Sequence, residues 1–556
     1  MEERSLFIVG AAGEGIQTIG GVVARCFLSH GYPAFATSEF ESRIRGGNSS
    51  VRIRVADEPR NAPVETADVL LAVNPDALAH YRPALREGGL LISPEGPDTE
   101  KNAVQVPFFD LAVEHGGEAI YANAVAAGTL CAAGGLPFSV LETVLANSFS
   151  SKGEETVRAN VASARAGFDC ALPQLAKGRI ARIPARSRRY AFASANETIP
   201  IAAAAAGCRF MAAYPMSPST GIITAFARHP ELGVFAEQAE DEIAAINMAL
   251  GASAAGARAM TATSGGGFAL MVEGISLAGM IETPIVIVLA QRPGPATGLP
   301  TRTAQEDLLF ALRGGHGEFP KALLAPSDPQ DAIDKTFRAF DLADRYQIPV
   351  IVLTDQFLAD SQFSLDELTL PENSLKTHLA DPKEIGDYAR YRLTEDGISP
   401  RLAFGQSEHL VVLDSDEHTE FGHITEDLTD LRPAMVEKRM EKGRRLEREM
   451  AKPRSYRADE ADLVLIGWGS TKGAIDEAVG LLRSRGQDVG SLHFTEVWPL
   501  PELDLRDGVR YWTIEGNATG QFARLLESEA GLPIEGRIGR YDGLPIDAET
   551  ILGALS

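Results

Sequence analysis

Short apolar runs recur along the chain and alternate with Ala-rich stretches that are long enough for a helix. Residues 6–9, 69–73 and 90–92 are such runs in the first third of the chain, and residues 285–289 and 350–353 follow later. Short apolar runs bounded by turn residues are typical of buried strands, and strands that alternate with helices predict a mostly parallel sheet. We therefore expect an α/β protein with several doubly wound domains.

The chain has 556 residues, which at about 150 residues per domain predicts three or four domains. Changes in composition suggest where they begin and end. The expected parts are an α/β domain at 1–176, a linker at 177–189, a second α/β domain at 190–372, an extended connector at 373–455 and a third α/β domain at 456–556.

Two of these parts carry unusual charge. Residues 177–189 hold six Lys/Arg and no acid, which fits either a docking strip or a solvated linker. In the connector, residues 414–430 hold seven acids and no Lys/Arg, whereas residues 432–457 hold ten Lys/Arg and four acids. Pro433 can occupy the first turn of a helix that reaches to about Met450. We expect this connector to pack on another part of the protein.

Composition excludes several classes of protein. Lys+Arg is 52 and Asp+Glu is 76, so the net charge is −24, which disfavours binding to nucleic acid or to an anionic membrane. The acidic N-terminus predicts neither a signal nor a transit peptide, and the most apolar stretch, 284–290, is too short to span a bilayer. The cysteines are scattered without a Cys-x-x-Cys pair, which argues against a disulfide framework and against an iron–sulfur or zinc site within this chain. They are Cys26, Cys131, Cys170 and Cys208. A cytoplasmic enzyme or enzyme subunit is the expectation.

A glycine-rich turn follows the first predicted strand and precedes a helix expected from Ile16 to about Ser29. Its glycines, Gly10, Gly13 and Gly15, have the spacing G-x-x-G-x-G, whereas a dinucleotide-binding loop has G-x-G-x-x-G. Amide groups at the start of that helix could bind an anion. A tight turn that lets helix and sheet pack closely is an equal alternative.

Residues 38–50 combine two arginines, Arg43 and Arg45, with two glycines and several serines. Arginine forks onto phosphate oxygens, so the segment could bind an anion, and a solvated hairpin loop is the alternative. Together with the glycine turn, this segment resembles the γ-subunit domain of 2-oxoacid:ferredoxin oxidoreductases. The resemblance covers about residues 1–176 and includes Asn123. It implies an association with coenzyme A, with Gly10, Gly13, Gly15, Arg43 and Arg45 in the region concerned.

The heptad from Tyr214 to Thr220 reads Tyr-Pro-Met-Ser-Pro-Ser-Thr. Its two prolines fix their own φ and disfavour helix in the residues before them, so the heptad should form a rigid loop that presents hydroxyl groups. Taken alone, the heptad could simply be a helix start, with Ser219 or Thr220 capping a helix over residues 221–229.

Three later segments make the heptad more informative: residues 237–242, 260–268 and 291–301. In order and spacing, the four segments resemble the α-subunit of 2-oxoacid:ferredoxin oxidoreductases, the pyrimidine-binding half of a thiamine diphosphate enzyme. The family heptad is usually Tyr-Pro-Ile-Thr-Pro-Ser-Thr, so Met216 and Ser217 depart from it while a hydroxyl is kept. The family's later loop is usually Arg-Gly-Gly-Pro-Ser-Thr-Gly, from which Pro293 and Ala296 depart while Arg292 is kept.

The C-terminal part extends the resemblance. Residues 515–521 resemble the family's transketolase-C-terminal-like domain, and residues 417–423 resemble a connector segment of its 2-oxoglutarate-type members. The resemblance therefore spans nearly the whole chain and is that of a fused γ–α subunit.

The resemblance implies a reaction and a set of partners. A complex of this family decarboxylates a 2-oxoacid on thiamine diphosphate with Mg, passes electrons through iron–sulfur clusters to ferredoxin and forms an acyl-CoA. The chain lacks the Gly-Asp-Gly…Asn diphosphate motif and clustered cysteines, which in the family belong to a separate β subunit, so a dimer of heterodimers is expected. 2-Oxoglutarate is favoured as substrate over pyruvate, branched-chain 2-oxoacids and indolepyruvate. A Rossmann-type dehydrogenase and a non-catalytic scaffold are more distant alternatives.

The resemblance also assigns site residues. Glu242 matches the glutamate that contacts the aminopyrimidine ring, and it is the catalytic candidate. Arg292 and Ser217, with Tyr214, are candidates for binding the substrate carboxylate. Each has a plainer alternative, namely a surface salt bridge for Arg292, a cap for Ser217, and for Glu242 an acidic helix N-terminus shared with Glu240 and Asp241.

Overall fold

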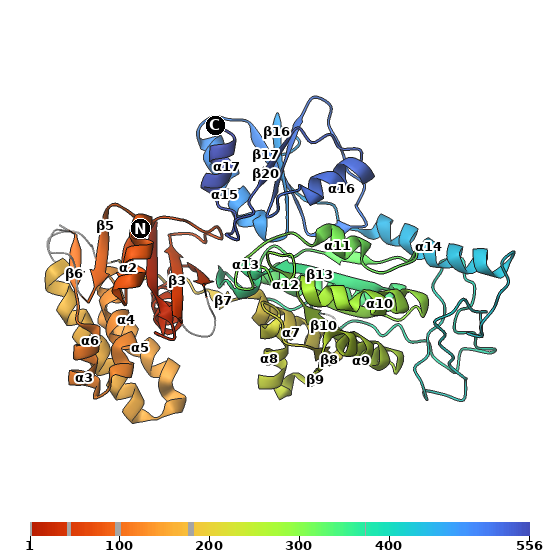
Figure 1. Cartoon of the computed structure of the whole chain (residues 1–556), viewed down its shortest axis with the longest axis horizontal. Helices are drawn as coiled ribbons and strands as arrows, with labels where there is room; N and C mark the ends of the chain where they lie inside the picture. The colour runs from red at the N-terminus through yellow and green to blue at the C-terminus, as the bar shows by residue number, and fades with distance from the viewer. Residues whose placement is uncertain (1–2, 42–45, 95–101, 176–182, 373) are drawn as a thin grey trace. The chain divides into compact units, whose positions relative to one another are not determined.

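The structure is a computed structural model that describes residues 3–41, 46–94, 102–175, 183–372 and 374–556. The chain forms two compact units, one of Met1–Ala193 with Ser361–Leu368 and one of Ser194–Asp360 with Thr369–Ser556. The first is drawn in red to orange and the second mostly in yellow to blue (Figure 1). Among the described residues, no helix is both long enough and apolar enough to cross a membrane.

The first unit is built on a six-stranded sheet in the order β2-β3-β1-β4-β5-β6. Strands β1, β4, β5 and β6 are parallel, whereas β2 and β3 form an antiparallel hairpin beside β1. The strands are β1 (Arg4–Ala12), β2 (Ala34–Phe40), β3 (Gly46–Val55), β4 (Ala67–Ala72), β5 (Leu85–Ser93) and β6 (Ala103–Gln105). The helices are α1 (Ile16–Ser29), α2 (Pro75–Tyr81), α3 (Phe108–Gly116), α4 (Ala122–Ala133), α5 (Phe138–Phe149) and α6 (Glu154–Leu175).

Side chains that alternate along β1 explain the layers of this unit. Leu6 and Ile8 join the core beneath α1 and α4–α6, whereas Phe7 and Val9 join a smaller core beneath α2. The predicted strands and the first predicted helix are confirmed. The mostly parallel sheet is confirmed only for β1, β4, β5 and β6, because the short connection between β2 and β3 forces them to run antiparallel. The described parts of residues 38–50 are the ends of that hairpin.

The described part of the basic linker makes contacts with the first unit although residues 184–189 are exposed, so the choice between a docking strip and a solvated linker stays open. Ile183 is buried in the core of the unit, and the Arg186 amide donates to the His30 carbonyl at 3.0 Å. The Arg186 guanidinium lies over the Tyr32 ring, and Arg188 pairs with Glu58 and Asp366. Strand β7 (Ala191–Ala193) then pairs with β14 (Phe363–Leu365), which adds a later segment to this unit.

The second unit contains a seven-stranded sheet in the order β18-β12-β13-β11-β10-β8-β9, parallel except for β18. Helices α9 and α10 pack over Ile285, Ile287 and Leu289 of β11 on one face of it. Its strands are β8 (Cys208–Ala213), β9 (Phe235–Gln238), β10 (Arg258–Thr263), β11 (Ile285–Gln291), β12 (Ala322–Leu324), β13 (Pro349–Asp355) and β18 (Glu496–Trp498). The helices are α7 (Ala195–Ala205), α8 (Thr220–Arg228), α9 (Glu242–Ala254), α10 (Gly265–Met280), α11 (Leu308–Arg313), α12 (Pro329–Tyr346) and α13 (Gln356–Asp360).

The C-terminal residues form a five-stranded sheet in the order β15-β17-β16-β19-β20, in which only β15 is antiparallel to its neighbour. Trp468, Phe494 and Phe522 belong to the same apolar core as α9 and α10, which explains why both sheets lie in one unit. The strands are β15 (Arg454–Tyr456), β16 (Leu463–Trp468), β17 (Val489–Phe494), β19 (Arg510–Glu515) and β20 (Gly536–Gly539). The helices are α15 (Lys472–Ser484), α16 (Gln521–Glu529) and α17 (Ala548–Ala554). The fold class predicted from the sequence is confirmed, whereas the boundaries of the five predicted parts stay a prediction.

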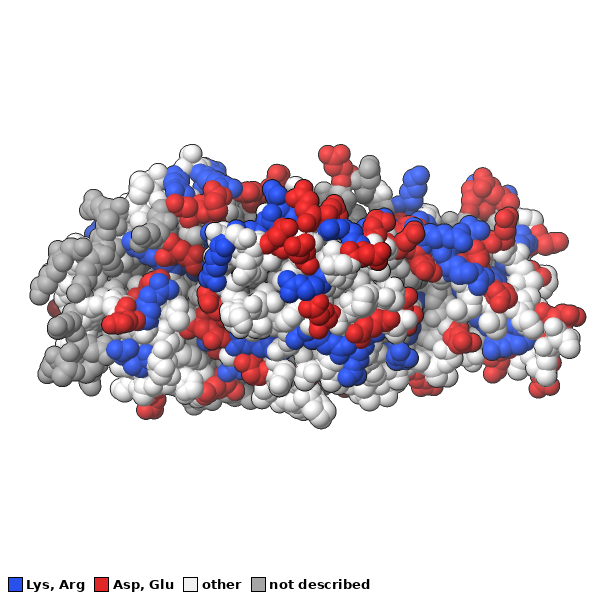
Figure 2. Space-filling view, turned by 90° about the horizontal axis from the view of Figure 1, so that it is seen from above, with Lys and Arg blue, Asp and Glu red and all other residues white. Residues whose placement is uncertain are grey.

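The connector ends in the predicted helix, α14 (Leu431–Glu449), with Pro433 in its first turn. Its opposite charges meet, because Glu417 of the acidic stretch pairs with Arg432 and Arg439 of the basic stretch. The connector packs on its own unit, where Lys438 and Lys442 reach Glu282 at the end of α10. On the described part of the face drawn in Figure 2, Lys and Arg side chains stand among Asp and Glu side chains and form no continuous basic field.

The Glu282 cluster is a buried set of charges. The Glu282 carboxylate accepts from the Lys438 and Lys442 ammonium groups at 2.5 and 2.6 Å, and all three side chains are almost fully buried. Burial opposes ionisation of Glu282, but Lys442, Lys438 and Arg390 outweigh that effect and hold its pKa well below the ordinary value. The negative charge of Glu282 is therefore what allows two ammonium groups to be buried here.

We expect Glu282→Ala to lower the free energy of unfolding by about 3–5 kcal/mol, because it leaves two buried ammonium groups without their counter-ion. Denaturant unfolding measures the change. Glu273→Ala, at an exposed position on the helix α10 that precedes Glu282, is the control and should change stability by less than about 0.5 kcal/mol. Equal unfolding midpoints for the two variants would contradict the assignment.

Candidate functional site

The parallel strands of the seven-stranded sheet bring the predicted site segments together. Strands β8, β9, β10 and β11 all run in one direction, so their carboxyl ends meet at one edge. Ligands of open α/β sheets bind at that edge. The segments that follow these strands are residues 214–220, 239–242, 264–267 and 292–298.

Glu242 is the first residue of α9 and is buried, with 3% of its surface exposed. The three neighbouring acids point in different directions, as helical geometry requires. Glu240 is exposed, and the Asp241 carboxylate caps α9 by accepting from the Ala244 amide at 2.7 Å. Glu242 lies on the buried side of the helix with Ile246. The alternative of an acid that only stabilises the helix N-terminus therefore applies to Asp241 and not to Glu242.

The Glu242 carboxyl faces a glycine turn at the start of α10. Its Oε1 is buried and has no hydrogen-bond partner among the described residues. A Cβ atom placed on Gly267 would lie 2.4 Å from that oxygen and 2.0 Å from Thr263 Oγ1, so only glycine fits at this position. Burial, with a smaller contribution from Asp241, raises the pKa of Glu242. The site therefore holds a buried acid that has one oxygen left to bond.

The Tyr214–Thr220 heptad forms the loop after β8. Ser219 stands at the N-cap of α8, but its hydroxyl donates to the Met216 carbonyl at 2.7 Å and does not cap the helix. The expectation of a side-chain cap by Ser219 is therefore wrong, because the Ser219 hydroxyl is bonded to the Met216 carbonyl instead. The Met216 sulfur lies 3.9 Å from Thr263 Oγ1, which places Met216 beside the Gly267 turn.

Arg292 and Ser217 are in direct contact. Arg292 follows β11, is half-buried, and donates from Nη1 to the Ser217 carbonyl at 2.8 Å. The contact uses the backbone of Ser217 and leaves its hydroxyl available to a ligand. Tyr214 lies on the same loop with 41% of its surface exposed. The roles of Arg292, Ser217 and Tyr214 in substrate binding stay predictions.

A further acid, Asp307, was missed by the sequence reasoning. One oxygen of its carboxyl, Oδ2, is buried and has no hydrogen-bond partner among the described residues, and a Cβ atom on Gly265 would lie 2.5 Å from it. Burial and the neighbouring Glu306 raise the pKa of Asp307, Arg292 lowers it, and the result is about 6. An Asp before a short apolar helix looks like an ordinary N-cap, which hid it in the sequence.

The glycine turn of the first unit is largely explained by packing within that unit. The Glu14 carboxylate folds back and accepts from the Ala11 amide and from the Asn74 side chain, both at 2.6 Å. A Cβ atom on Gly15 would lie 1.9 Å from the Asn123 amide nitrogen, so Gly15 allows a close approach of α1 and α4. Gly13 has a φ of 97° and needs to be glycine for that reason. Arg43 and Arg45 lie outside the described residues.

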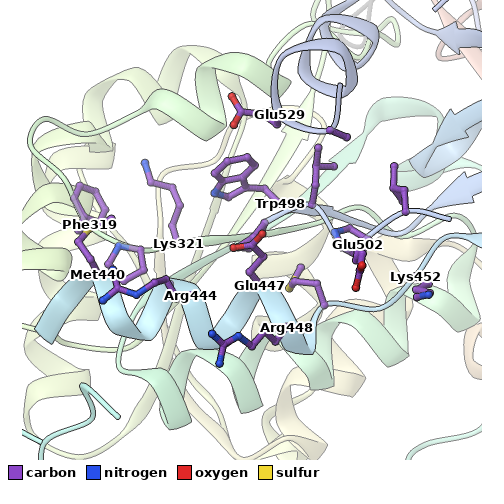
Figure 3. A pocket seen from close by; sticks show the side chains of 18 of the residues that line it. Phe319, Lys321, Met440, Arg444, Glu447, Arg448, Lys452, Trp498, Glu502 and Glu529 are labelled. Atoms are coloured by element: carbon purple, nitrogen blue, oxygen red, sulfur yellow. The ribbon is translucent and has the colours of Figure 1, made fainter. Parts of the chain in front are cut away.

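A cavity of about 960 Å³ lies elsewhere in the second unit, and none of the predicted site residues lines it. Its walls come from α14, from the segment around Lys321 and from the segment that follows β18 (Figure 3). Lys321 donates to the Gly314 carbonyl, and burial lowers its pKa to about 8. Volume alone therefore does not identify the functional site in this protein. Among the described residues, no cluster of three or more His, Cys, Asp or Glu could hold a metal ion.

We expect Gly267→Ala to destabilise the protein and to displace Glu242, because the new methyl group would overlap both Thr263 and Glu242. The cost should be about 1–3 kcal/mol, the usual range for overpacking. Gly251→Ala is the matched control, since Gly251 lies in α9 with no other atoms within 4 Å of the added Cβ. It should stabilise the helix by up to about 1 kcal/mol. Thermal unfolding checks both, and a Gly267→Ala variant as stable as Gly251→Ala would contradict the close contact.

Comparison with known proteins identifies the family. Residues 201–438 match the family model "Pyruvate flavodoxin/ferredoxin oxidoreductase, thiamine diP-bdg", and residues 5–170 match "Pyruvate ferredoxin/flavodoxin oxidoreductase". The chain is 30% identical to 2-oxoacid:ferredoxin oxidoreductase 2, subunit alpha, from Aeropyrum pernix, over 100% of this chain and 97% of that relative. It is 36% identical to 2-oxoglutarate synthase subunit KorA from Methanocaldococcus jannaschii, over 56% of this chain and 83% of that protein.

A solved structure agrees over the full length. The 2-oxoglutarate:ferredoxin oxidoreductase from Magnetococcus marinus, solved with 2-oxoglutarate, coenzyme A and succinyl-CoA bound, superposes with a TM-score of 0.90. It is 31% identical, and the match covers 100% of this chain and 99% of that one. The chain belongs to the 2-oxoacid:ferredoxin oxidoreductase family, as an alpha subunit of the fused γ–α type that forms part of an oxidoreductase complex.

Proposed function

We propose that this subunit acts with a separate β subunit in the oxidative decarboxylation of a 2-oxoacid, first of all 2-oxoglutarate. The products are an acyl-CoA, carbon dioxide and two electrons, which pass to ferredoxin. The observation that carries the proposal is the buried Glu242 carboxyl, whose free oxygen faces the Gly267 turn. This pair lies within the segment that matches the thiamine diphosphate-binding family model.

The residues present fit the aminopyrimidine half of thiamine diphosphate. A flat ring could approach the backbone where Gly267 lacks a side chain, and the free oxygen of Glu242 could bond to a ring nitrogen. Thiamine diphosphate, when bound, supplies the carbon nucleophile and the electron sink that decarboxylation of a 2-oxoacid requires. Burial disfavours the charged form of Glu242 and raises its pKa, which makes the carboxyl better able to exchange a proton with the ring. We assign Mg and the diphosphate mainly to the β subunit.

Arg292 and Ser217 are the groups proposed to hold the substrate carboxylate. A guanidinium can donate two parallel hydrogen bonds to a carboxylate, and the Ser217 hydroxyl can add a third. The Arg292–Ser217 contact of 2.8 Å supports a shared role, because it places both donors at the same edge of the sheet. Tyr214 would border this pocket from the same loop. Pyruvate, branched-chain 2-oxoacids and indolepyruvate are the alternative substrates, and the names of the KorA relative and of the Magnetococcus marinus enzyme favour 2-oxoglutarate.

Coenzyme A is the proposed second substrate, and we assign it to the first unit. The support is the match of residues 5–170 to a family model and the coenzyme A in the related structure from Magnetococcus marinus. Gly10, Gly13 and Gly15, with Arg43 and Arg45, remain the proposed region. Iron–sulfur clusters are assigned to the β subunit and electron transfer to ferredoxin, in a cytoplasmic dimer of heterodimers.

Co-expression tests this function. The chain produced alone should be colourless and should decarboxylate no 2-oxoacid, because the diphosphate and cluster sites are assigned to the partner. The chain purified with its β subunit should be brown and should reduce ferredoxin with 2-oxoglutarate and coenzyme A. Assays with 2-oxoglutarate, pyruvate, 2-oxoisovalerate and indolepyruvate rank the substrates. Decarboxylation by the colourless chain alone, or no turnover by the brown complex on any of the four, would refute the proposal.

Replacement of Glu242 tests its role as the acid. Glu242→Gln in the assembled complex should lower kcat by about 10²- to 10⁴-fold, the usual range for loss of a general acid–base group, while cluster content and assembly are unchanged. The amide keeps the shape of the side chain but cannot exchange a proton. Glu240→Gln is the matched control, since Glu240 is two residues away and exposed, and it should keep near-normal turnover. An active Glu242→Gln complex beside an inactive Glu240→Gln complex would mean that the roles of these acids are misassigned.

A further inference from the structure

Asp307 differs from three other aspartates that begin helices in this unit, although Asp430 before α14 also makes no capping bond. Asp241, Asp328 and Asp547 each accept a hydrogen bond from an amide in the first turn of the helix that follows, at 2.7, 2.9 and 2.7 Å. Such caps stabilise a helix by about 1 kcal/mol. Asp307 occupies the same position before α11, yet its side chain makes no capping bond. Its carboxyl is instead turned toward Gly265, at the start of α10.

The C-terminal domain holds Asp307 in this place. The Gln305 amide donates to the Gly516 carbonyl at 2.7 Å, and the Gly516 amide donates back to Gln305 Oε1 at 2.9 Å. Gln521 accepts from the Leu309 amide at 2.9 Å and donates to the Glu306 carbonyl at 2.5 Å. Residues of the turn at 516–521 therefore form hydrogen bonds with the segment on both sides of Asp307.

The same segment reaches the loop that carries Arg292. The Asp307 amide donates to the Gln291 side chain at 2.9 Å, and the Glu306 carboxylate accepts from the Gly294 amide at 3.0 Å. Gln291 and Gly294 flank Arg292 in the chain. Asp307 is thus bonded to the end of β11 from which the Arg292 side chain projects, and the two side chains are close enough for Arg292 to lower the pKa of Asp307.

We propose that Asp307 is a further positioning residue of the site. The affinity of Arg292 for a substrate carboxylate then depends on whether Asp307 is protonated. This inference rests on the function proposed above. Neutral Asp307 adds no negative charge beside Arg292, whereas ionised Asp307 repels an incoming carboxylate and offsets part of the charge of Arg292. By linkage, binding of the carboxylate in turn favours the protonated form of Asp307.

The groups around Asp307 determine the direction of the pH effect on carboxylate binding and the pH range in which it occurs. Glu306 on its own segment favours the neutral form, and Arg292 at the end of β11 favours the charged form. The first turn of α10 carries no acid, and its positive end favours the charged form. Gln521, from the C-terminal turn, is neutral. Burial outweighs the groups that favour the charged form, so the pKa of Asp307 is about 6. The change in carboxylate affinity therefore falls between about pH 5 and 7.

The test uses the assembled complex and compares wild type with Asp307→Asn. In wild type, KM for 2-oxoglutarate should rise roughly fivefold between pH 5.5 and pH 7.5, because ionised Asp307 weakens carboxylate binding. In Asp307→Asn, KM should be nearly constant over this range. Calorimetry with glutarate, a dicarboxylate that cannot be decarboxylated, adds a measurement independent of turnover. Wild type should take up a fraction of a proton on binding near pH 6.5, and Asp307→Asn should take up none.

Asp331→Asn is the matched control, since Asp331 is also a buried acid whose pKa burial raises, but it pairs with Arg454 away from the site. It should alter stability and keep the wild-type pH dependence of KM. Gln521→Ala, which frees the segment on one side of Asp307, should raise KM for 2-oxoglutarate several-fold with little change in kcat, whereas Arg524→Ala, at an exposed position on the same helix, should change neither.

The outcomes separate this inference from the proposed function. A wild-type complex that turns over no 2-oxoacid overturns both. If wild type is active and Arg292→Lys raises KM, while Asp307→Asn keeps the wild-type pH dependence and proton uptake, the function stands and the inference fails. A flat pH dependence in Asp307→Asn together with a normal one in Asp331→Asn supports it.

Discussion

The parallel pairing of β8, β10 and β11 is the constraint on which the candidate site depends. Parallel strands place all their carboxyl ends at one edge, so loops separated by up to about eighty residues in sequence converge there. Met216, Thr263 and Arg292 meet for this reason alone. Strand β11 is fully buried, and β8 and β10 are buried over most of their length. The positions of the loops therefore follow from packing that takes no part in the chemistry.

Buried polar groups divide into two kinds in this protein. Glu282 is buried with two ammonium groups on its carboxylate, and it holds the connector helix in place. Glu242 and Asp307 are different, because each keeps a buried oxygen without a partner among the described residues. Leaving such an atom unbonded costs about 1–3 kcal/mol, and a fold selected for stability alone would satisfy or remove it. Both acids face the glycine turn at the start of α10, Asp307 at Gly265 and Glu242 at Gly267. A ligand bound at this turn could form hydrogen bonds with the two unbonded oxygens.

Much of this could be predicted from the sequence. Apolar runs and Ala-rich stretches are local signals, so the strands β1 and β11 and the helices α1 and α14 were expected at nearly their observed positions. Glu242 was expected at a helix N-terminus or in a cofactor site, and the structure places it as the buried first residue of α9. A hairpin loop was one of the two alternatives for residues 38–50, whereas the lengths of β2 and β3 depend on pairing with β1, which no local pattern shows. The contacts of the basic linker with Tyr32 and Glu58 could not be predicted, because these partners are distant in sequence.

Asp307 shows why part of a site escapes sequence reasoning. Its neighbours in the chain predict a helix cap, and the conflict appears only when Gln521, more than two hundred residues later, takes the amide of Leu309 that begins the helix. With that amide occupied from outside, the Asp307 carboxyl has less reason to cap its own helix and can turn toward Gly265. The C-terminal domain therefore shapes this edge of the candidate site through bonds to backbone groups that no local pattern reveals. It thus determines the direction in which the Asp307 side chain points.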